Sequence, residues 1–211
     1  MRNLISIPFL CFNMVITLIK QTSPGRLTVS LNSGEDVKTT LGVVTDMRLY
    51  SGKELDNERL EEFRLLSRRS LAREKALEIL SKRPMSRMEL YKKLLEKGED
   101  ETDADYCVSW LADNGLINDE SYACAVARHY AAKGMGAGRI KTELSKRGIS
   151  RELWEDALEA APDNSEKIDK FISSRLKDPN DRAQVGKVSQ ALYRRGFSWE
   201  EIRAALERFE K

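Results

Sequence analysis

One nine-residue pattern occurs three times along the chain. Residues 90–98 read LYKKLLEKG, residues 140–148 read IKTELSKRG, and residues 188–196 read VSQALYRRG. Each has an apolar residue, then Leu four positions later, a basic residue three positions after that, and finally Gly. The apolar pair lies on one helix face, the basic residue complements the negative helix end, and Gly suits the left-handed backbone just past a helix. Each segment therefore predicts the end of an amphipathic helix.

Further helices are predicted on both sides of each segment. Helical spacing precedes the segments in residues 70–83, 119–133 and 165–177. Ser86-x-x-Glu89 and Ser198-x-x-Glu201 are capping boxes, which mark helix starts. The chain therefore predicts three tandem three-helix repeats stacked in an elongated array. The repeats are expected in residues 56–118, 119–161 and 162–211.

The N-terminal part has a different pattern. Residues 14–21 and 26–32 are two β-rich runs joined by Ser23-Pro24-Gly25, which predicts a hairpin. Residues 41–49 look helical, so residues 14–55 are expected to form a small β-hairpin module that packs on other parts of the chain. Residues 1–13 are expected to come from an upstream start codon and to lie outside the fold. The fold class is thus mainly α, with a small N-terminal β-hairpin module ahead of the repeats.

The composition excludes several classes of protein. The chain has 211 residues, one His and three Cys, at positions too scattered for a zinc site or a disulfide framework. This cysteine usage is typical of a reducing cytoplasm. No nucleophile, base and orienting group stand together in the pattern of a catalytic site. We therefore expect neither an enzyme nor a bound cofactor or metal.

Three other motifs have structural explanations. Gly134-x-Gly136-x-Gly138 has no preceding strand and no Gly-Lys-Ser/Thr ending, so it is interpreted as a flexible joint between helices. Residues 99–105 are rich in acids but lack the Gly and distal Glu of a calcium loop. The three Trp residues stand at different offsets from the repeat glycines. They predict core or inter-repeat packing rather than a repeated stacking platform, although Trp199, after a cap serine, is a candidate for exposure.

The charges are sorted between the helices although the net charge is only +2. The second helices of the repeats carry +2, +3 and +4, and the third helices carry −5, −3 and −2. In repeats two and three, basic residues stand nine and two positions before the glycine, a spacing that puts both on one helix face. Such a stripe suits phosphates or an acidic protein groove, and solvated helix faces are the alternative explanation. The candidate contact residues are Arg139, Lys146, Arg147, Lys187, Arg194 and Arg195, with Lys97 and Arg128.

Together these motifs resemble the bacterial RecX regulatory family. The resemblance is carried by residues 115–123, which read GLINDESYA, and by Arg128, Lys133-Gly134-x-Gly136, Arg139-Ile140, Glu143-Leu144 and Lys146-Arg147-Gly148-Ile149. Upstream, Ala76-Leu77-x-x-Leu80, Arg83-Pro84, Glu89-Leu90 and Leu94-x-x-Lys97-Gly98 are similar as well. The resemblance covers roughly residues 14–211 and is strongest over residues 76–160. The chain departs from the family in residues 1–13, in Asn118 where Asp is frequent, and in a more divergent third repeat.

The resemblance implies a modulator of the RecA recombinase without chemistry of its own. Members of the family bind RecA and the RecA–single-stranded DNA filament, limit filament extension, and reduce its ATPase, strand-exchange and co-protease activities, which restrains recombination, DNA repair and the SOS response. A monomer without membrane contact is expected. Two alternatives stay open on the residues alone: a helix-turn-helix-like duplex DNA binder, and a protein-interaction scaffold with no nucleic-acid role. Residues 88–90 and 137–139 offer few base-reading side chains, which counts against the duplex binder.

Overall fold

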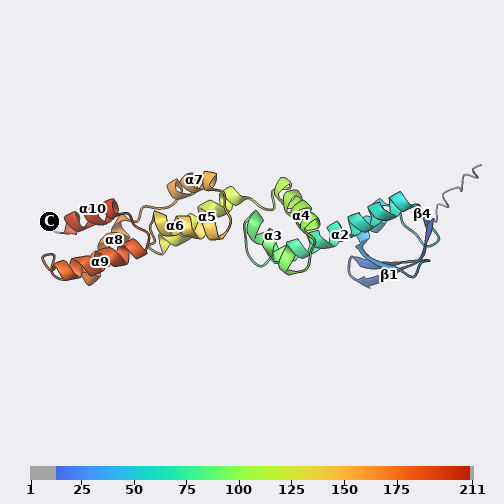
Figure 1. The fold of residues 1–211 in the computed structure, drawn as a ribbon, viewed down its shortest axis with the longest axis horizontal. Helices are drawn as coiled ribbons and strands as arrows, with labels where there is room; N and C mark the ends of the chain where they lie inside the picture. The colour runs from blue at the N-terminus through green and yellow to red at the C-terminus, as the bar shows by residue number, and fades with distance from the viewer. Residues whose placement is uncertain (1–12, 210–211) are drawn as a thin grey trace, which may run out of the picture. The chain divides into compact units, whose positions relative to one another are not determined.

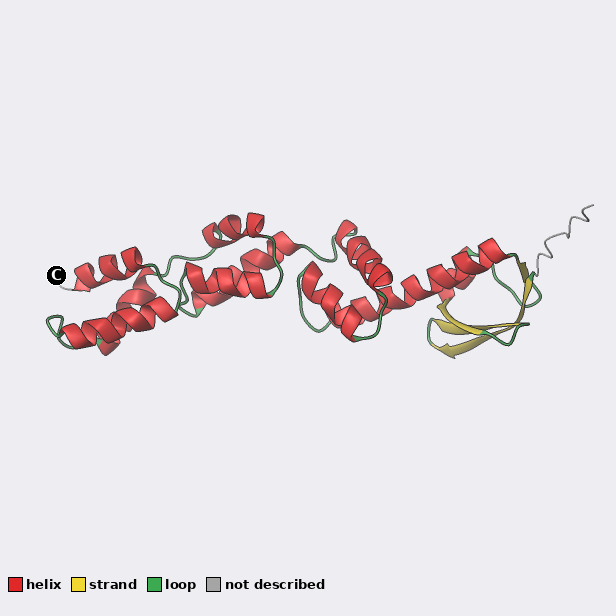
Figure 2. Cartoon of the chain, in the orientation of Figure 1, coloured by secondary structure: helices red, strands yellow, loops and turns green. Residues whose placement is uncertain are grey.

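The computed structural model describes residues 13–209 and shows a mainly helical chain with one small β-sheet (Figures 1 and 2). The expectation for residues 1–13 falls outside the described residues, apart from Asn13. The chain divides into two compact units. One comprises the residues up to Ile79 together with Leu94–Cys107, and the other comprises Leu80–Lys93 and the residues from Val108 onward. None of the described helices is long and apolar enough to cross a membrane.

The first unit contains a four-stranded antiparallel sheet. Its strands are β1 (Met14–Ser23), β2 (Arg26–Leu31), β3 (Asp36–Thr40) and β4 (Glu54–Leu55), in the order β3-β2-β1-β4. The predicted hairpin is confirmed as β1 and β2, and its turn uses a left-handed Gly25 with φ of 76°. The other two strands were missed because β3 is short and polar and β4 has only two residues. Two added strands give the hairpin the wider sheet that stability in water requires.

The sheet is covered by helix α2 (Asn57–Leu80), and the short helix α1 (Leu41–Asp46) follows β3. Alternate strand residues point inward, and Ile16 and Val29 are fully buried with Phe63 from α2 in one core. Helix α2 is longer than the predicted helix over residues 70–83, because its first half belongs to this core. The N-terminal module and the first repeat therefore share one continuous helix.

The predicted order of helices is confirmed in all three repeats. Repeat one has α3 (Arg87–Glu96) and α4 (Glu101–Asp113) after α2. Repeat two has α5 (Asp119–Ala132), α6 (Ala137–Lys146), the 3-10 turn η1 (Arg151–Leu153) and α7 (Trp154–Glu159). Repeat three has α8 (Ser165–Arg175), α9 (Arg182–Arg194) and α10 (Trp199–Phe209). Repeat two has its own hydrophobic core around Leu144, and repeat three has a separate core around Leu192.

The helix ends follow the local chemistry that the sequence indicated. Gly98, Gly148 and Gly196 have φ values of 83°, 66° and 91°, the left-handed conformation expected past a helix end. Both capping boxes form. The Glu89 N–H donates to Ser86 Oγ at 3.0 Å, and the Glu201 N–H donates to Ser198 Oγ at 3.2 Å. The Ser86 box thus marks the start of α3, the Ser198 box marks the start of α10, and the three glycines follow the ends of the second helices α3, α6 and α9.

Candidate nucleic-acid and filament interface

The C-terminal end of α9 meets the N-terminal end of α6. The Gly136 N–H donates to the carbonyl oxygen of Arg195, and the Gly138 N–H donates to the carbonyl oxygen of Gly196, both at 2.9 Å. A helix start has free N–H groups and a helix end has free carbonyls, so each end satisfies the other. The end of α9 is therefore hydrogen-bonded directly to the start of α6.

The end of α6 meets the start of α3 in the same register. The Ser86 hydroxyl donates to the carbonyl oxygen of Arg147, and a Cβ on Gly148 would collide with the side chain of Met88. Ser86 and Gly136 both stand twelve residues before their repeat glycine. The repeated glycine thus has a second role, because it lets one second helix approach the start of the previous repeat's second helix closely.

The motif at residues 115–123 supports this second junction. Asn118 caps α5, accepting from the Ser121 N–H at 2.8 Å, so Asn in place of Asp keeps the cap. Asp119 accepts from the N–H of Arg87 at 2.9 Å, and the Tyr122 hydroxyl donates to Glu89 Oε2 at 2.9 Å. Residues that carry the family resemblance therefore hold repeat two onto the start of α3.

Glu143 lies between three of the predicted contact residues on α6. Its buried carboxylate contacts Arg139 Nη2 and Lys146 Nζ at 3.2 Å each, and Arg147 Nη1 at 2.8 Å. The hydrogen bond from Arg147, aided by bonds from Tyr130 and Lys146, lowers the pKa of Glu143 to about 2. The spacing of seven does place Arg139 and Lys146 on one face. The charge pattern did not predict that Glu143, four positions after Arg139, forms ion pairs with both of these residues.

The predicted basic residues fall into two groups in the structure. Arg147 has a largely buried side chain held by Glu143, and the Arg195 guanidinium lies 4.3 Å from the centre of the Phe171 ring. Both also supply the carbonyls that join the repeats. Lys187 and Arg194 are exposed on α9, and neither has an ion-pair partner among the residues that the structure describes. Lys187 and Arg194 are thus more accessible to a partner than Arg147 and Arg195.

Arg128 and Lys97 occupy different parts of the chain. Arg128 is exposed on α5, and Lys97 is exposed at the end of α3, in the first compact unit. Neither lines the hollow at the α9–α6 junction.

A shallow hollow at the α9–α6 junction brings two predicted residues together. It encloses about 430 Å³ and is lined by Arg139 from repeat two and by Tyr193 and Arg194 from repeat three. Tyr193 was missed by the sequence analysis, since a Tyr within a helix is more often part of a core. The end-to-end joint therefore places cations of two repeats beside one another.

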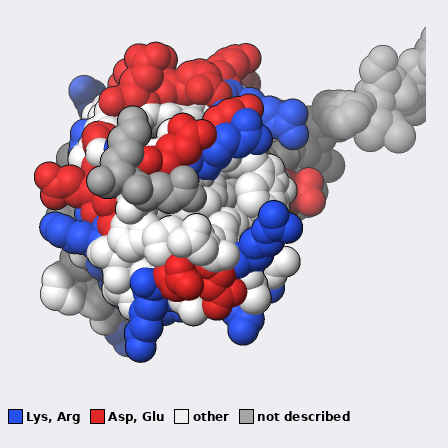
Figure 3. Space-filling view, turned by 90° about the vertical axis from the view of Figure 1, so that its left-hand side faces the viewer, with Lys and Arg blue, Asp and Glu red and all other residues white. Residues whose placement is uncertain are grey.

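The charges near the C-terminal end are mixed. Figure 3 shows acidic side chains gathered along the upper edge of this face and basic ones standing out at its sides and lower edge. Lys and Arg pair locally with acids in places, as Arg208 does with Asp169 at 2.7 Å. This face therefore offers both signs of charge rather than one uniform field.

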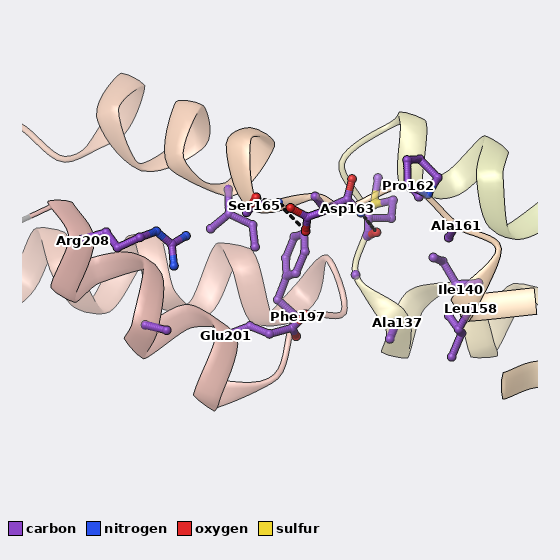
Figure 4. A pocket seen from close by; sticks show the side chains of 16 residues that line it. Ala137, Ile140, Leu158, Ala161, Pro162, Asp163, Ser165, Phe197, Glu201 and Arg208 are labelled. Atoms are coloured by element: carbon purple, nitrogen blue, oxygen red, sulfur yellow. Dashed lines mark hydrogen bonds between the residues drawn. The ribbon is translucent and has the colours of Figure 1, made fainter.

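A second cavity, of about 380 Å³, lies where repeats two and three meet (Figure 4). Ala137, Ile140 and Leu158 form an apolar wall on one side, and Phe197 stands opposite. Asp163 in its rim accepts a hydrogen bond from the Ser165 hydroxyl, and this contact helps to lower the pKa of Asp163. Nowhere in residues 13–209 do three His, Cys, Asp or Glu side chains gather as a metal site would need. The cavity is lined by residues of both repeats.

The fold and the basic junction define a tandem three-helix-repeat protein with a candidate binding surface on its second helices. The models of the first, second and third three-helix domains of RecX match residues 72–111, 118–158 and 169–206. The chain is 35% identical to the regulatory protein RecX of Chromohalobacter salexigens over 139 residues, 64% of this chain and 90% of that one. It is 37% identical to RecX of Xanthomonas axonopodis pv. citri over 135 residues, 63% of this chain and 83% of that one.

Solved structures agree with these matches. A crystal structure of regulatory protein RecX aligns with a TM-score of 0.73 at 25% identity, covering 92% of this chain and 99% of the other. RecX from Lactobacillus salivarius aligns with a TM-score of 0.62 at 29% identity, covering 68% of this chain and 97% of the other. The chain belongs to the RecX family of regulatory proteins.

Proposed function

We propose that this protein binds RecA and the RecA–single-stranded DNA filament and inhibits filament extension, ATPase, strand exchange and co-protease activity. Membership of the RecX family supports the partner. The observation that carries the proposal for this chain is the α9–α6 junction, where Arg139 and Arg194 line one hollow. Cations on the surfaces of two joined repeats suit a ligand with repeated negative charge, such as a nucleic-acid backbone or an acidic filament groove.

The exposed cations and the cations engaged within the fold have different roles. Lys187 and Arg194 contact the filament, together with Arg139 and Lys146, whose charges exceed what the single carboxylate of Glu143 neutralises. Arg147 and Arg195 act by holding the repeats in register, because their guanidinium groups are engaged within the fold. Inhibition then follows from binding: contacts that span neighbouring RecA subunits hold or displace them, and no bond is made or broken.

The test is a titration of RecA ATPase on single-stranded DNA with the full chain. We expect inhibition at substoichiometric ratios, because a contact at one place in a filament limits its extension beyond that place. The double variant Lys187→Gln/Arg194→Gln should inhibit several-fold less. Glutamine keeps both helix positions compatible with α9 and removes only the charge.

The matched control is Lys20→Gln/Lys170→Gln, which removes the same charge from exposed positions on β1 and α8. It should inhibit like the unaltered protein. Full inhibition by the Lys187/Arg194 double variant would remove these residues from the interface. No inhibition by the folded unaltered chain would overturn the proposal. Sequence-specific binding to duplex DNA would then favour the helix-turn-helix alternative, and absence of any DNA affinity would favour the scaffold.

A further inference from the structure

Two aromatic side chains are stacked on the surface of repeat three. The rings of Tyr193, on α9, and Trp199, at the start of α10, have centroids 5.2 Å apart and planes inclined by 19°. Tyr193 is 55% exposed and Trp199 is 53% exposed, although each ring uses one face on the other. The outer ring faces therefore meet solvent. Large aromatic rings left in water at a helix junction indicate a surface that a partner covers.

Cations flank this stack. Arg194 follows Tyr193 directly in the chain and is exposed without an ion-pair partner among the described residues, and Arg139 lines the same hollow. Arg139 pairs with the buried Glu143 at 3.2 Å, and the carboxylate that lines the hollow itself, that of Glu201, accepts a hydrogen bond from the Ser198 N–H at 2.7 Å. Glu201 is thus occupied as a cap and forms no ion pair with either arginine. The hollow keeps net positive charge beside an open aromatic face.

We propose that Tyr193 and Trp199 form a stacking platform for an unpaired nucleobase, with Arg194 and Arg139 holding the adjacent phosphates. Flat rings beside cations are the combination that binds single strands without sequence preference. A duplex is a poor occupant because its bases are already stacked on one another. The inference rests on the proposed function in taking a nucleic acid as partner, and it adds a specific site and a preference for single strands.

The experiment measures affinity for bare single-stranded DNA, without RecA. Fluorescence anisotropy of labelled oligothymidylate is titrated with the full chain, with Trp199→Ala, and with Tyr193→Ala. Loss of base stacking should weaken binding about five-fold or more for Trp199→Ala. The salt dependence of affinity should stay the same, because no phosphate contact is lost. In contrast, Arg194→Gln should lower the slope of log affinity against log salt by about 0.7.

An oligomer of the same length with abasic sugars separates the bases from the phosphates. The unaltered protein should bind it as weakly as Trp199→Ala binds oligothymidylate, and Trp199→Ala should bind both oligomers equally. This double-mutant logic tests the contact between ring and base directly. Tyr50→Ala is the matched control, since Tyr50 is a 62% exposed tyrosine on the first compact unit. It should leave the affinity unchanged. Circular dichroism confirms that the variants are folded.

Several results would overturn the platform. Equal affinity of Trp199→Ala and the unaltered chain for oligothymidylate would exclude stacking. A Trp199→Ala variant that loses binding to the RecA filament but not to bare DNA would show that the rings dock on protein. A chain that inhibits RecA but binds no bare single strand would exclude the platform and leave the proposed function standing. A chain that binds single strands through their bases but does not inhibit RecA would overturn the proposed function and leave the platform standing.

Discussion

The backbone N–H of Gly138 donates a hydrogen bond to the carbonyl oxygen of Gly196, 58 positions later in the chain, at a distance of 2.9 Å. The sequence predicts a flexible joint in the glycine-rich residues 134–138, and this segment does connect α5 with the first turn of α6. Its glycines, however, serve a close backbone contact with the end of α9. A Cβ on Gly136 would lie 2.5 Å from the Gly196 oxygen, and a Cβ on Gly196 would lie 2.1 Å from the Arg139 nitrogen. The segment is a docking site for the next repeat.

Gly136→Ala should therefore destabilise the protein, by about 1–3 kcal/mol, because the new methyl group has no space at the junction. Gly186→Ala is the matched control. Gly186 occupies the position in repeat three that Gly138 occupies in repeat two, but a Cβ there meets no atom within 4 Å. Alanine favours helix, so this change should stabilise by up to about 1 kcal/mol. Urea unfolding of both variants measures the difference. Equal stability of the two would show that the junction tolerates a side chain.

Glu143→Gln should destabilise the protein at pH 7, by roughly 1.5–3 kcal/mol, because a buried carboxylate with charged donors is lost. The pKa of Glu143 falls from 4.5 to about 2 on folding. A lowered folded-state pKa stabilises the folded form above the unfolded value, and this stabilisation is lost as the pH falls from about 4.5 towards 2. The stability gap between Glu143→Gln and the unaltered protein should thus narrow over that interval. Urea midpoints at pH 7, 5, 3 and 2 measure it.

Glu155→Gln provides the comparison for that experiment. Glu155 pairs with Lys141 at 2.8 Å but its side chain is 72% exposed, so the pair contributes little. The Glu155→Gln variant should have the same stability as the unaltered protein at every pH. A gap that stays constant for Glu143→Gln down to pH 2 would contradict the lowered pKa.

Ser86→Ala should cost more stability than Ser198→Ala. Both serines cap a helix through the same pair of hydrogen bonds, and loss of such a cap costs about 1 kcal/mol. Ser86 is fully buried and also donates to the carbonyl oxygen of Arg147 at the end of α6, so its loss leaves that carbonyl without this donor. We expect roughly 1 kcal/mol of additional destabilisation. Thermal or urea unfolding of the two variants measures the difference. Equal losses of stability would mean that the hydrogen bond to Arg147 contributes nothing.

Phe63→Ala should destabilise the first compact unit by about 3–5 kcal/mol, since Phe63 is fully buried between α2 and the sheet. Leu18→Ala, on an exposed position of β1, should change stability by less than about 0.5 kcal/mol. Hydrogen exchange of the strand amides reports on the unit directly. Unchanged protection of β1 and β2 in Phe63→Ala would show that α2 is not needed to hold the sheet.

Local chemistry was enough to predict most of the helices. Apolar spacing, a cap serine with its glutamate, and a glycine past the end all act within about four residues of one another, so they can be read along the chain. The hairpin turn at Gly25 belongs to the same class of signal. Strand β3 has no such local signal. Its mostly polar residues form a strand because they pair with β2.

The three repeats, their helix ends and the sorting of charge between helices can all be predicted from residues that lie close together in the chain. Three features are visible only in the folded chain: the repeat glycines join one repeat to the next, Glu143 neutralises part of the basic stripe, and the exposed rings of Tyr193 and Trp199 stack. The physical reason is range. Capping and helix periodicity depend on neighbours in the chain, whereas close backbone contacts, buried ion pairs and exposed stacks depend on which distant surfaces the folded helices bring together.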